Sequence, residues 1–178
     1  MSHTDLDSEE VIINMRKELN YDLFKDEIVQ IFTANQEIVL ATSSNNRVTS
    51  RTVSFANDGL EIFFWSWEHN KKIEQIKDNP KVALTLYNIQ YEGEAEILGK
   101  PLDKRNESYI ALFYKKFSKA YVETFSKIPG MVLVRIVPIT IMKFERIQNR
   151  FHLQKMDAKA KKVFQMRIED KYHSEFPY

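Results

Sequence analysis

Two adjacent lysines and one arginine are the residues in this sequence best suited to bind an anion. Lys71 and Lys72 follow Asn70, a common helix-capping residue, in the segment NKKIEQIKDNP. The start of a helix already carries about half a positive charge, so lysines are mildly unfavourable there. A phosphate group would remove this conflict, because helix amides and lysines together favour negative charge. The segment therefore suggests a phosphate site.

Arg51 lies in the segment TSRTVSF, and an aromatic run ending at Trp67 comes just before the lysines. A hairpin through Asn57-Asp58-Gly59 is expected to pair the strand of Arg51 with residues 60–66. This pairing places Arg51 near Trp65–Trp67, where three cations, a helix start and aromatic rings meet. Such a site suits a ligand with a phosphate at one end and a flat ring at the other. In the alternative interpretation, Arg51 pairs with a glutamate, the lysines are solvated and the tryptophans only pack.

Several functional classes lack their usual residues. The chain has 178 residues, a net charge of +1, no cysteine, four scattered histidines and only four glycines. These features disfavour nucleic-acid binding, thiol chemistry, a metal site, a Rossmann or P-loop nucleotide site and a GxSxG nucleophile. No catalytic side chain can be assigned. Without a signal-peptide pattern or an apolar stretch of membrane-spanning length, we expect a soluble cytoplasmic protein that does not bind membranes.

The periodicity of apolar residues predicts an α+β fold, mainly antiparallel β, that forms a barrel with peripheral helices. Asp22 is expected to cap the first helix, whose buried face includes Leu23, Ile28 and Phe32. We expect one domain over residues 1–178, with a lead-in at 1–20, helical near Glu9–Leu19, and a basic extension at 148–178. The expected elements are a helix at 22–35, strands at 37–43, 47–56 and 60–66, a helix at 70–78, strands at 81–88 and 90–98, a helix at 104–126 capped by Asp103, and a long or bent strand at 131–145 interrupted at Pro138.

The order of four segments resembles the pyridoxamine 5'-phosphate oxidase-like family of FMN-binding split β-barrels. The segments are SRTVSF, DG-LEIFFWSW, NKKIEQIKDNPKVALTLY and YEGEAEI. The resemblance is closest to the short general stress protein branch, and it covers roughly residues 22–98 with a continuation through 131–145. It implies a split β-barrel that binds FMN at the interface of a homodimer.

The resemblance also implies a role for individual residues. The FMN phosphate would be held by Arg51, Lys71 and Lys72. The backbone of Thr52 and Val53 would run along the flavin, with Trp65 and Ser66 beside the ribityl chain and ring. Gln90 would reach the flavin from the partner subunit.

The sequence departs from the full-length oxidases at several positions. Those oxidases carry a lysine where this chain has Ala56, and their basic pair usually begins with arginine instead of Lys71. Arg150 and His152 match an Arg-x-His signature, but Gln154 replaces the arginine that follows. Oxidation of vitamin B6 is therefore not the favoured activity.

The leading hypothesis is an FMN-dependent oxidoreductase with an unknown small-molecule substrate. His69, Arg150 and His152 are candidates for orienting that substrate. The alternative is a non-enzymatic, stress-related protein that binds flavin, deazaflavin or haem. Haem would require an axial ligand such as His69, His152 or His173.

Overall fold

The computed structural model of the chain describes residues 16–168. Every strand pairing in this part of the chain is antiparallel. The predicted α+β class, mainly antiparallel β, is therefore confirmed, with ten strands instead of about six. The elements are β1 (Arg16–Leu19), α2 (Tyr21–Ala34), β2 (Glu37–Ser44), β3 (Arg47–Ser54), β4 (Ala56–Asp58), β5 (Glu61–Trp67), α3 (Lys71–Asp78), β6 (Lys81–Leu86), β7 (Ile89–Gly99), a 3₁₀ turn (Lys104–Asn106), α4 (Glu107–Lys116), α5 (Lys119–Ser126), β8 (Met131–Ile147), β9 (Arg150–Asp157) and β10 (Lys162–Arg167).

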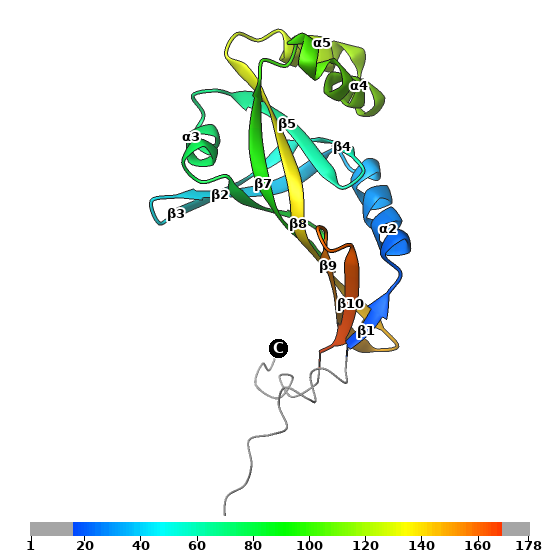
Figure 1. Cartoon of the computed structure of the whole chain (residues 1–178). Coiled ribbons are helices and arrows are strands. Elements are labelled where there is room, and N and C mark those ends of the chain that lie inside the picture. Colours follow the sequence, from blue (N-terminus) through cyan, green and yellow to red (C-terminus); the bar gives the residue numbers. More distant parts are fainter. Residues whose placement is uncertain (1–15, 169–178) are drawn as a thin grey trace, which may run out of the picture.

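The long strand β8 organises the sheet. One edge of β8 pairs with β7, while its other edge pairs first with β5, over Met131–Trp67 to Ile136–Ile62, and then with β9. Figure 1 shows β8 running from the upper body of the molecule into an arm formed by β9, β10 and β1. The strand order β1-β10-β9-β8-β7-β6-β2-β3 leaves the sheet open, as in a split barrel. As predicted, Pro138 lies at an irregularity, where the pairing with β7 shifts next to Gly93.

Two hydrophobic clusters lie on opposite faces of β5. Ile62 and Phe64 belong to a barrel core that also contains residues of α2 and α3. Phe63 and Trp65 belong to a second cluster beneath α4 and α5. Successive side chains of a strand point to opposite faces, so a strand buried on both faces is hydrophobic throughout.

The first helix begins differently from the prediction. Asn20, not Asp22, is the N-cap residue, and its side chain accepts a hydrogen bond from the amide of Leu23. Leu23 is 72% exposed, and the buried face contains Phe24, Ile28 and Phe32. The cap thus lies two residues earlier than expected, and Phe24, four residues before Ile28, takes the place on the buried face that was predicted for Leu23.

The predicted pairing of residues 47–56 with residues 60–66 is wrong for most of its length. The chain is interrupted at Phe55, and only β4 forms the hairpin with β5. β3 pairs instead with β2, where Arg51 lies opposite Leu40. The interruption allows the fully buried Phe55 ring to enter the barrel core.

The predicted helix 104–126 is divided into a 3₁₀ turn and two α-helices. Asp103 precedes the 3₁₀ turn without capping it through its side chain. The break between α4 and α5 falls at Phe117, and Ser118 caps α5 by accepting a hydrogen bond from the amide of Tyr121. Tyr109 and Phe113 of α4 and Tyr121 and Phe125 of α5 all contribute to the second cluster.

Both ends of the described chain are strands. Residues 16–19, predicted to belong to a partly helical lead-in, form β1 and pair with β10. The basic extension from residue 148 contributes β9 and β10. Residues 1–15 of the predicted lead-in and residues 169–178 of the predicted extension, which include His173, lie outside the described residues.

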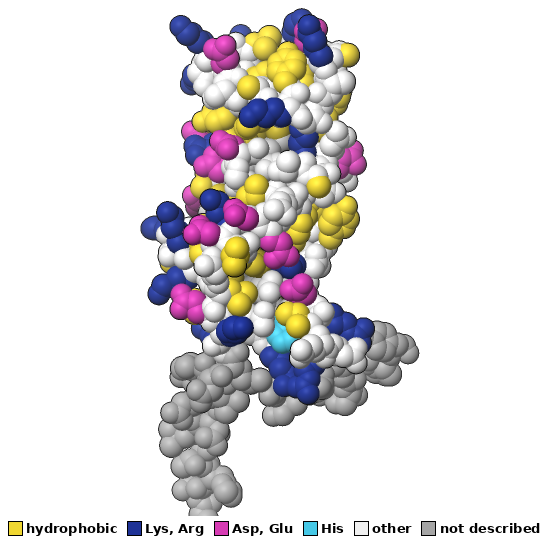
Figure 2. All heavy atoms as spheres, turned by 90° about the vertical axis from the view of Figure 1, so that its right-hand side faces the viewer, with side chains coloured by type: hydrophobic (Ala, Val, Ile, Leu, Met, Phe, Trp, Pro, Cys, Tyr) yellow, Lys and Arg dark blue, Asp and Glu magenta, His cyan; other side chains and the backbone are white. Residues whose placement is uncertain are grey.

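The visible surface carries interspersed charges. Figure 2 shows acidic and basic side chains mixed with hydrophobic ones, without a large region of one sign on that face. No helix within residues 16–168 is long and apolar enough to cross a membrane.

Candidate functional site

The start of α3 forms as predicted. Asn70 is the N-cap, and its backbone carbonyl accepts hydrogen bonds from the amides of Ile73 and Glu74 at 2.8 and 3.2 Å. The amides of Lys71 and Lys72 precede these bonds and therefore have no partner within the helix. The Asn70 side chain donates to Ser66 Oγ at 3.0 Å, which ties the helix start to the end of β5.

The two lysines have different surroundings. Lys72 is half-buried, and its Nζ donates to the buried hydroxyl of Ser66 at 3.1 Å. Lys71 is exposed and forms an ion pair with Glu74 at 3.3 Å. Lys72 therefore belongs to an inward-facing site, whereas Lys71 already has a partner on the surface.

Arg51 reaches the same region from β3. Its guanidinium donates to Thr42 Oγ1 at 2.7 Å, to the Leu40 carbonyl at 3.4 Å and to Thr49 Oγ1. All these acceptors are neutral, and they hold the arginine in a fixed orientation.

A buried glutamine of α3 completes this network. Gln75 Oε1 accepts hydrogen bonds from Thr42 and Thr49, both at 2.7 Å, and its amide nitrogen donates to the Arg47 carbonyl at 2.9 Å. Gln75 is fully buried, so its amide group has no access to water and depends on these hydrogen bonds with the protein. The network connects α3 to β2 and β3 and thereby positions Arg51.

Arg51 and Lys72 leave the site with surplus positive charge. Within residues 16–168 neither side chain forms an ion pair. Burial lowers the pKa of Lys72, and the nearby charge of Arg51 lowers it further. Burial also lowers the pKa of Arg51. Two partly desolvated cations that repel each other form a site that an anion would stabilise.

The other predicted flavin contacts lie around this site in different ways. Ser66 contacts Lys72 directly. Thr52 and Val53 lie on β3 at the edge of the sheet, beside Arg51. The Trp65 side chain lies on the opposite face of β5, where it stacks on Phe113 with ring centroids 4.1 Å apart. The Trp65 side chain therefore packs against α4, and its predicted contact with the flavin stays a prediction.

The remaining predicted residues are not brought to this site within one chain. Gln90 lies on β7 and donates to Glu92 at 3.2 Å. His69 is exposed beside Glu68, while Arg150 and His152 lie on β9 in the arm. Their roles stay predictions. Within the described residues, no group of three or more His, Asp or Glu side chains is arranged to hold a metal ion.

Comparison with known proteins places this chain in a family. A family model described as pyridoxamine 5'-phosphate oxidase matches residues 24–173. The chain belongs to the pyridoxamine 5'-phosphate oxidase family. A comparison with curated proteins finds no match.

Several solved structures share this fold. General Stress Protein 26 from Bacillus anthracis is 25% identical, with a TM-score of 0.53 and coverage of 66% of this chain and 91% of that chain. An FMN-binding protein related to pyridoxamine 5'-phosphate oxidase from Nostoc punctiforme is 14% identical, with a TM-score of 0.53 and coverage of 95% and 100%. The haem storage protein HutZ from Vibrio cholerae is 16% identical, with a TM-score of 0.54 and coverage of 64% and 88%. Proteins of this fold thus differ in their ligands, and the ligand must be argued from the site.

Two departures from the full-length pyridoxamine 5'-phosphate oxidases have a structural counterpart. Ala56 is fully buried in the second hydrophobic cluster and supplies no cation. Gln154 is buried on β9, where it donates to Gln165 at 3.0 Å. Neither position contributes to the Arg51–Lys72 site.

Sequence reasoning missed Gln75, Thr42 and Thr49 as supports of Arg51. The only local signal for Gln75 was its position next to Ile76 on a short helix whose other buried residue is Ile73. The threonines belong to ordinary alternating strands, so their shared acceptor becomes visible only when the strands and α3 are placed together.

Proposed function

We propose that this protein binds FMN, with the phosphate between Arg51 and Lys72 at the start of α3. The observation that carries this proposal is the pair of partly buried cations without a carboxylate partner among the described residues. The guanidinium, the ammonium and the unpaired amides of the first turn are all donors, which is the set that a phosphate dianion requires. Membership of a family with an FMN-binding relative supports the choice of flavin.

We propose further that the protein is an oxidoreductase acting on a small molecule. Bound FMN would supply the electron or hydride exchange, while the protein supplies binding and orientation. Arg51 and Lys72 would fix the phosphate end, and Ser66 would hold Lys72 in place. The substrate roles of His69, Arg150 and His152, like the cytoplasmic location, stay predictions.

A homodimer is the assembly that we propose. The outer face of β2, β3, β6 and β7 exposes Val39 and Val48, and Ile139 of β8 is exposed next to it. A hollow of about 440 Å³ lies there, lined in part by Val48, Ala83 and Ile139. A second copy covering these apolar side chains would remove them from water. Gln90 of β7 lies opposite Thr85 of β6, and Thr85 lies opposite Val39 of β2. The Gln90 side chain is therefore on the same face of the sheet as Val39.

The test is a titration with FMN and with riboflavin, which lacks the phosphate, of Lys72→Ala and its neighbour Lys71→Ala. Losing a charged contact costs about 1.5–3 kcal/mol, so Lys72→Ala should weaken FMN binding about tenfold or more. Lys71→Ala should have little effect, and riboflavin affinity should be similar in all three proteins. Equal FMN affinity of the wild type and Lys72→Ala would refute the phosphate assignment. Haem binding without flavin binding would instead support the non-enzymatic alternative.

A further inference from the structure

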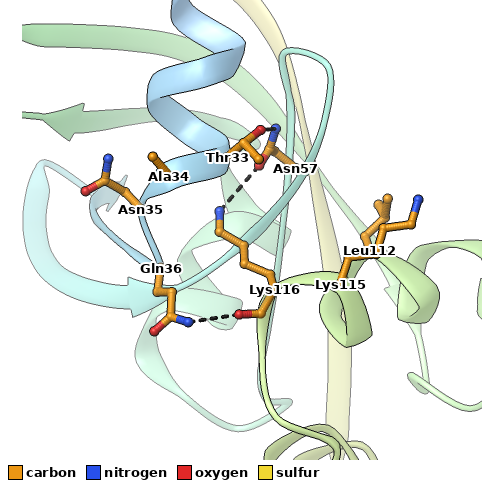
Figure 3. A pocket seen from close by; sticks show the side chains of 8 residues that line it. All are labelled: Thr33, Ala34, Asn35, Gln36, Asn57, Leu112, Lys115 and Lys116. Carbon is orange, nitrogen blue, oxygen red and sulfur yellow. Dashed lines mark hydrogen bonds between the residues drawn. The ribbon is translucent and has the colours of Figure 1, made fainter.

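A second pocket lies away from the flavin site, between the end of α2, β4 and the last turn of α4. Its volume is about 460 Å³, within the range of small-ligand sites. Thr33, Gln36, Asn57, Leu112, Lys115 and Lys116 are among the residues that line it. Figure 3 shows Lys116 in the middle of these side chains, with its amine directed toward Thr33 and Asn57. The pocket shares no residue with the Arg51–Lys72 site.

Lys116 is held firmly in this pocket. Its Nζ donates to the Phe32 carbonyl at 2.7 Å and to Asn57 Oδ1 at 3.3 Å. Its own carbonyl accepts a hydrogen bond from Gln36 Nε2 at 2.8 Å. The two side-chain bonds fix the amine between α2 and β4, and the bond from Gln36 fixes the backbone at the end of α4, so the amine does not sample the many orientations of a surface lysine.

The surroundings of Lys116 allow the amine to lose its proton. Within the described residues Lys116 has no carboxylate partner, and the other charged side chain lining the pocket is Lys115. Burial lowers the pKa of Lys116 to about 8, although the Phe55 ring 3.6 Å from Nζ favours the ammonium. At pH 7 such an amine is neutral in about a tenth of the molecules, against fewer than about one in a thousand for an ordinary lysine. The neutral amine keeps two N–H groups, so it can still donate one hydrogen bond to the Phe32 carbonyl and one to Asn57 Oδ1.

We propose that Lys116 is a reactive amine that binds a small aldehyde or ketone in this pocket as a reversible imine. The amine nitrogen forms a bond to the carbonyl carbon, and the carbon–oxygen bond then breaks. The two amine protons leave with the oxygen as water, so the reaction needs no oxidant or reductant. Buried lysines with a neutral fraction are the ones that form such adducts. Lys115, an exposed residue that also lines the pocket, favours a carbonyl compound that carries an anionic group.

The test is reductive trapping of the full-length protein with glyoxylate, an anionic aldehyde, and cyanoborohydride at neutral pH. Peptide mass spectrometry gives the labelling rate of each lysine, and Lys115 serves as the matched neighbour. We expect Lys116 to be labelled at least tenfold faster than Lys115, at a rate that saturates with glyoxylate concentration. Equal rates at the two lysines would overturn the proposal. A rate at Lys116 that stays linear in glyoxylate would show reactivity without a binding site and would also overturn it.

Two variants separate the pocket from the amine. Leu112→Trp should partly fill the pocket and slow labelling of Lys116, while labelling of Lys77, an exposed lysine of α3 that does not line the pocket, stays unchanged. Lys116→Arg should abolish the saturable labelling, with far-UV circular dichroism confirming the fold. If Lys116→Arg does not fold, the wild-type comparison of the two lysines and the Leu112→Trp rate still decide the matter. Unchanged Lys116 labelling in a folded Leu112→Trp protein would contradict the assignment to this pocket.

Discussion

Lys72 and Lys116 are both half-buried lysines without a carboxylate partner in the described chain, yet they lie at opposite ends of helices. Lys72 lies in the first turn of α3, next to unpaired amides and to Arg51, and its hydrogen-bond acceptor, Ser66, is neutral. Lys116 reaches the last turn of α2, where the Phe32 carbonyl accepts a hydrogen bond from its amine. The positive end of α3 therefore favours an anion beside Lys72, whereas the amine of Lys116 has its hydrogen-bond acceptors within the protein.

The largest effect is expected from breaking the support of the α3 region. Gln75→Leu would leave the Arg47 carbonyl and two threonine hydroxyls without their partner, at a cost of about 1–3 kcal/mol in the free energy of unfolding. Because Arg51 donates to those hydroxyls, FMN affinity should fall too. Urea unfolding and FMN titration measure the two effects, with the exposed position Lys77→Ala as control. Retained FMN affinity in Gln75→Leu would show that Arg51 does not depend on this network.

A smaller effect is expected at the end of α2. Lys116→Met keeps the apolar stem but removes two hydrogen bonds, which should lower the free energy of unfolding by about 1–2 kcal/mol. FMN affinity should not change, because the two sites share no residue. Weakened FMN binding in a folded Lys116→Met protein would mean that the two regions are coupled.

The same lysine should give stability a defined dependence on pH. The folded pKa of Lys116 is about 8, below its ordinary value of 10.5, so the unfolded chain binds more protons between these values. The contribution of Lys116 to stability should therefore rise as the pH rises through this window. The measurement is urea unfolding of the wild type and Lys116→Met at several pH values. A difference between them that is constant or falls with pH would contradict the assigned direction.

The smallest effect is expected at Lys71. Its ion pair with Glu74 is exposed on both sides, and its charge lies at the unfavourable end of α3. Removing it in Lys71→Ala should change the free energy of unfolding by no more than about 0.5 kcal/mol, measured by urea unfolding. A larger loss would indicate that Lys71 has a partner beyond Glu74.

Local patterns predicted the helix at residues 70–78 and the β2 strand almost to the residue. The signals that mark their ends, which are capping residues, turn residues and apolar alternation, all lie within a few positions of the elements themselves. The proximity of Arg51 and Lys72 was expected, but by the wrong route. The hairpin signal at Asn57–Gly59 was real, yet nothing nearby showed that Phe55 interrupts the strand. Pairing partners far apart in the sequence are fixed by the packing of the whole sheet.

The same limit explains the other differences. Ser118 was a capping residue inside a longer aromatic pattern, and the continuous pattern hid the break between α4 and α5. The lysine-rich stretch after residue 148 masked the alternation of β9 and β10, whose buried residues include Met156 and Val163. The Lys116 pocket had no sequence signal, since Thr33, Asn57 and Lys116 come from three separate segments.

The order of β5, β7 and β8 along the chain has a consequence for how the protein folds during synthesis. β5 and β7 emerge from the ribosome well before Met131–Ile147, the strand that pairs with both of them. Before β8 is made, the backbone groups on one edge of β5 and one edge of β7 lack their hydrogen-bonding partner strand. Such edges are prone to pair with other chains. Completion of β8 is thus the event that closes these edges, and slowing translation just before it should increase aggregation of the nascent protein.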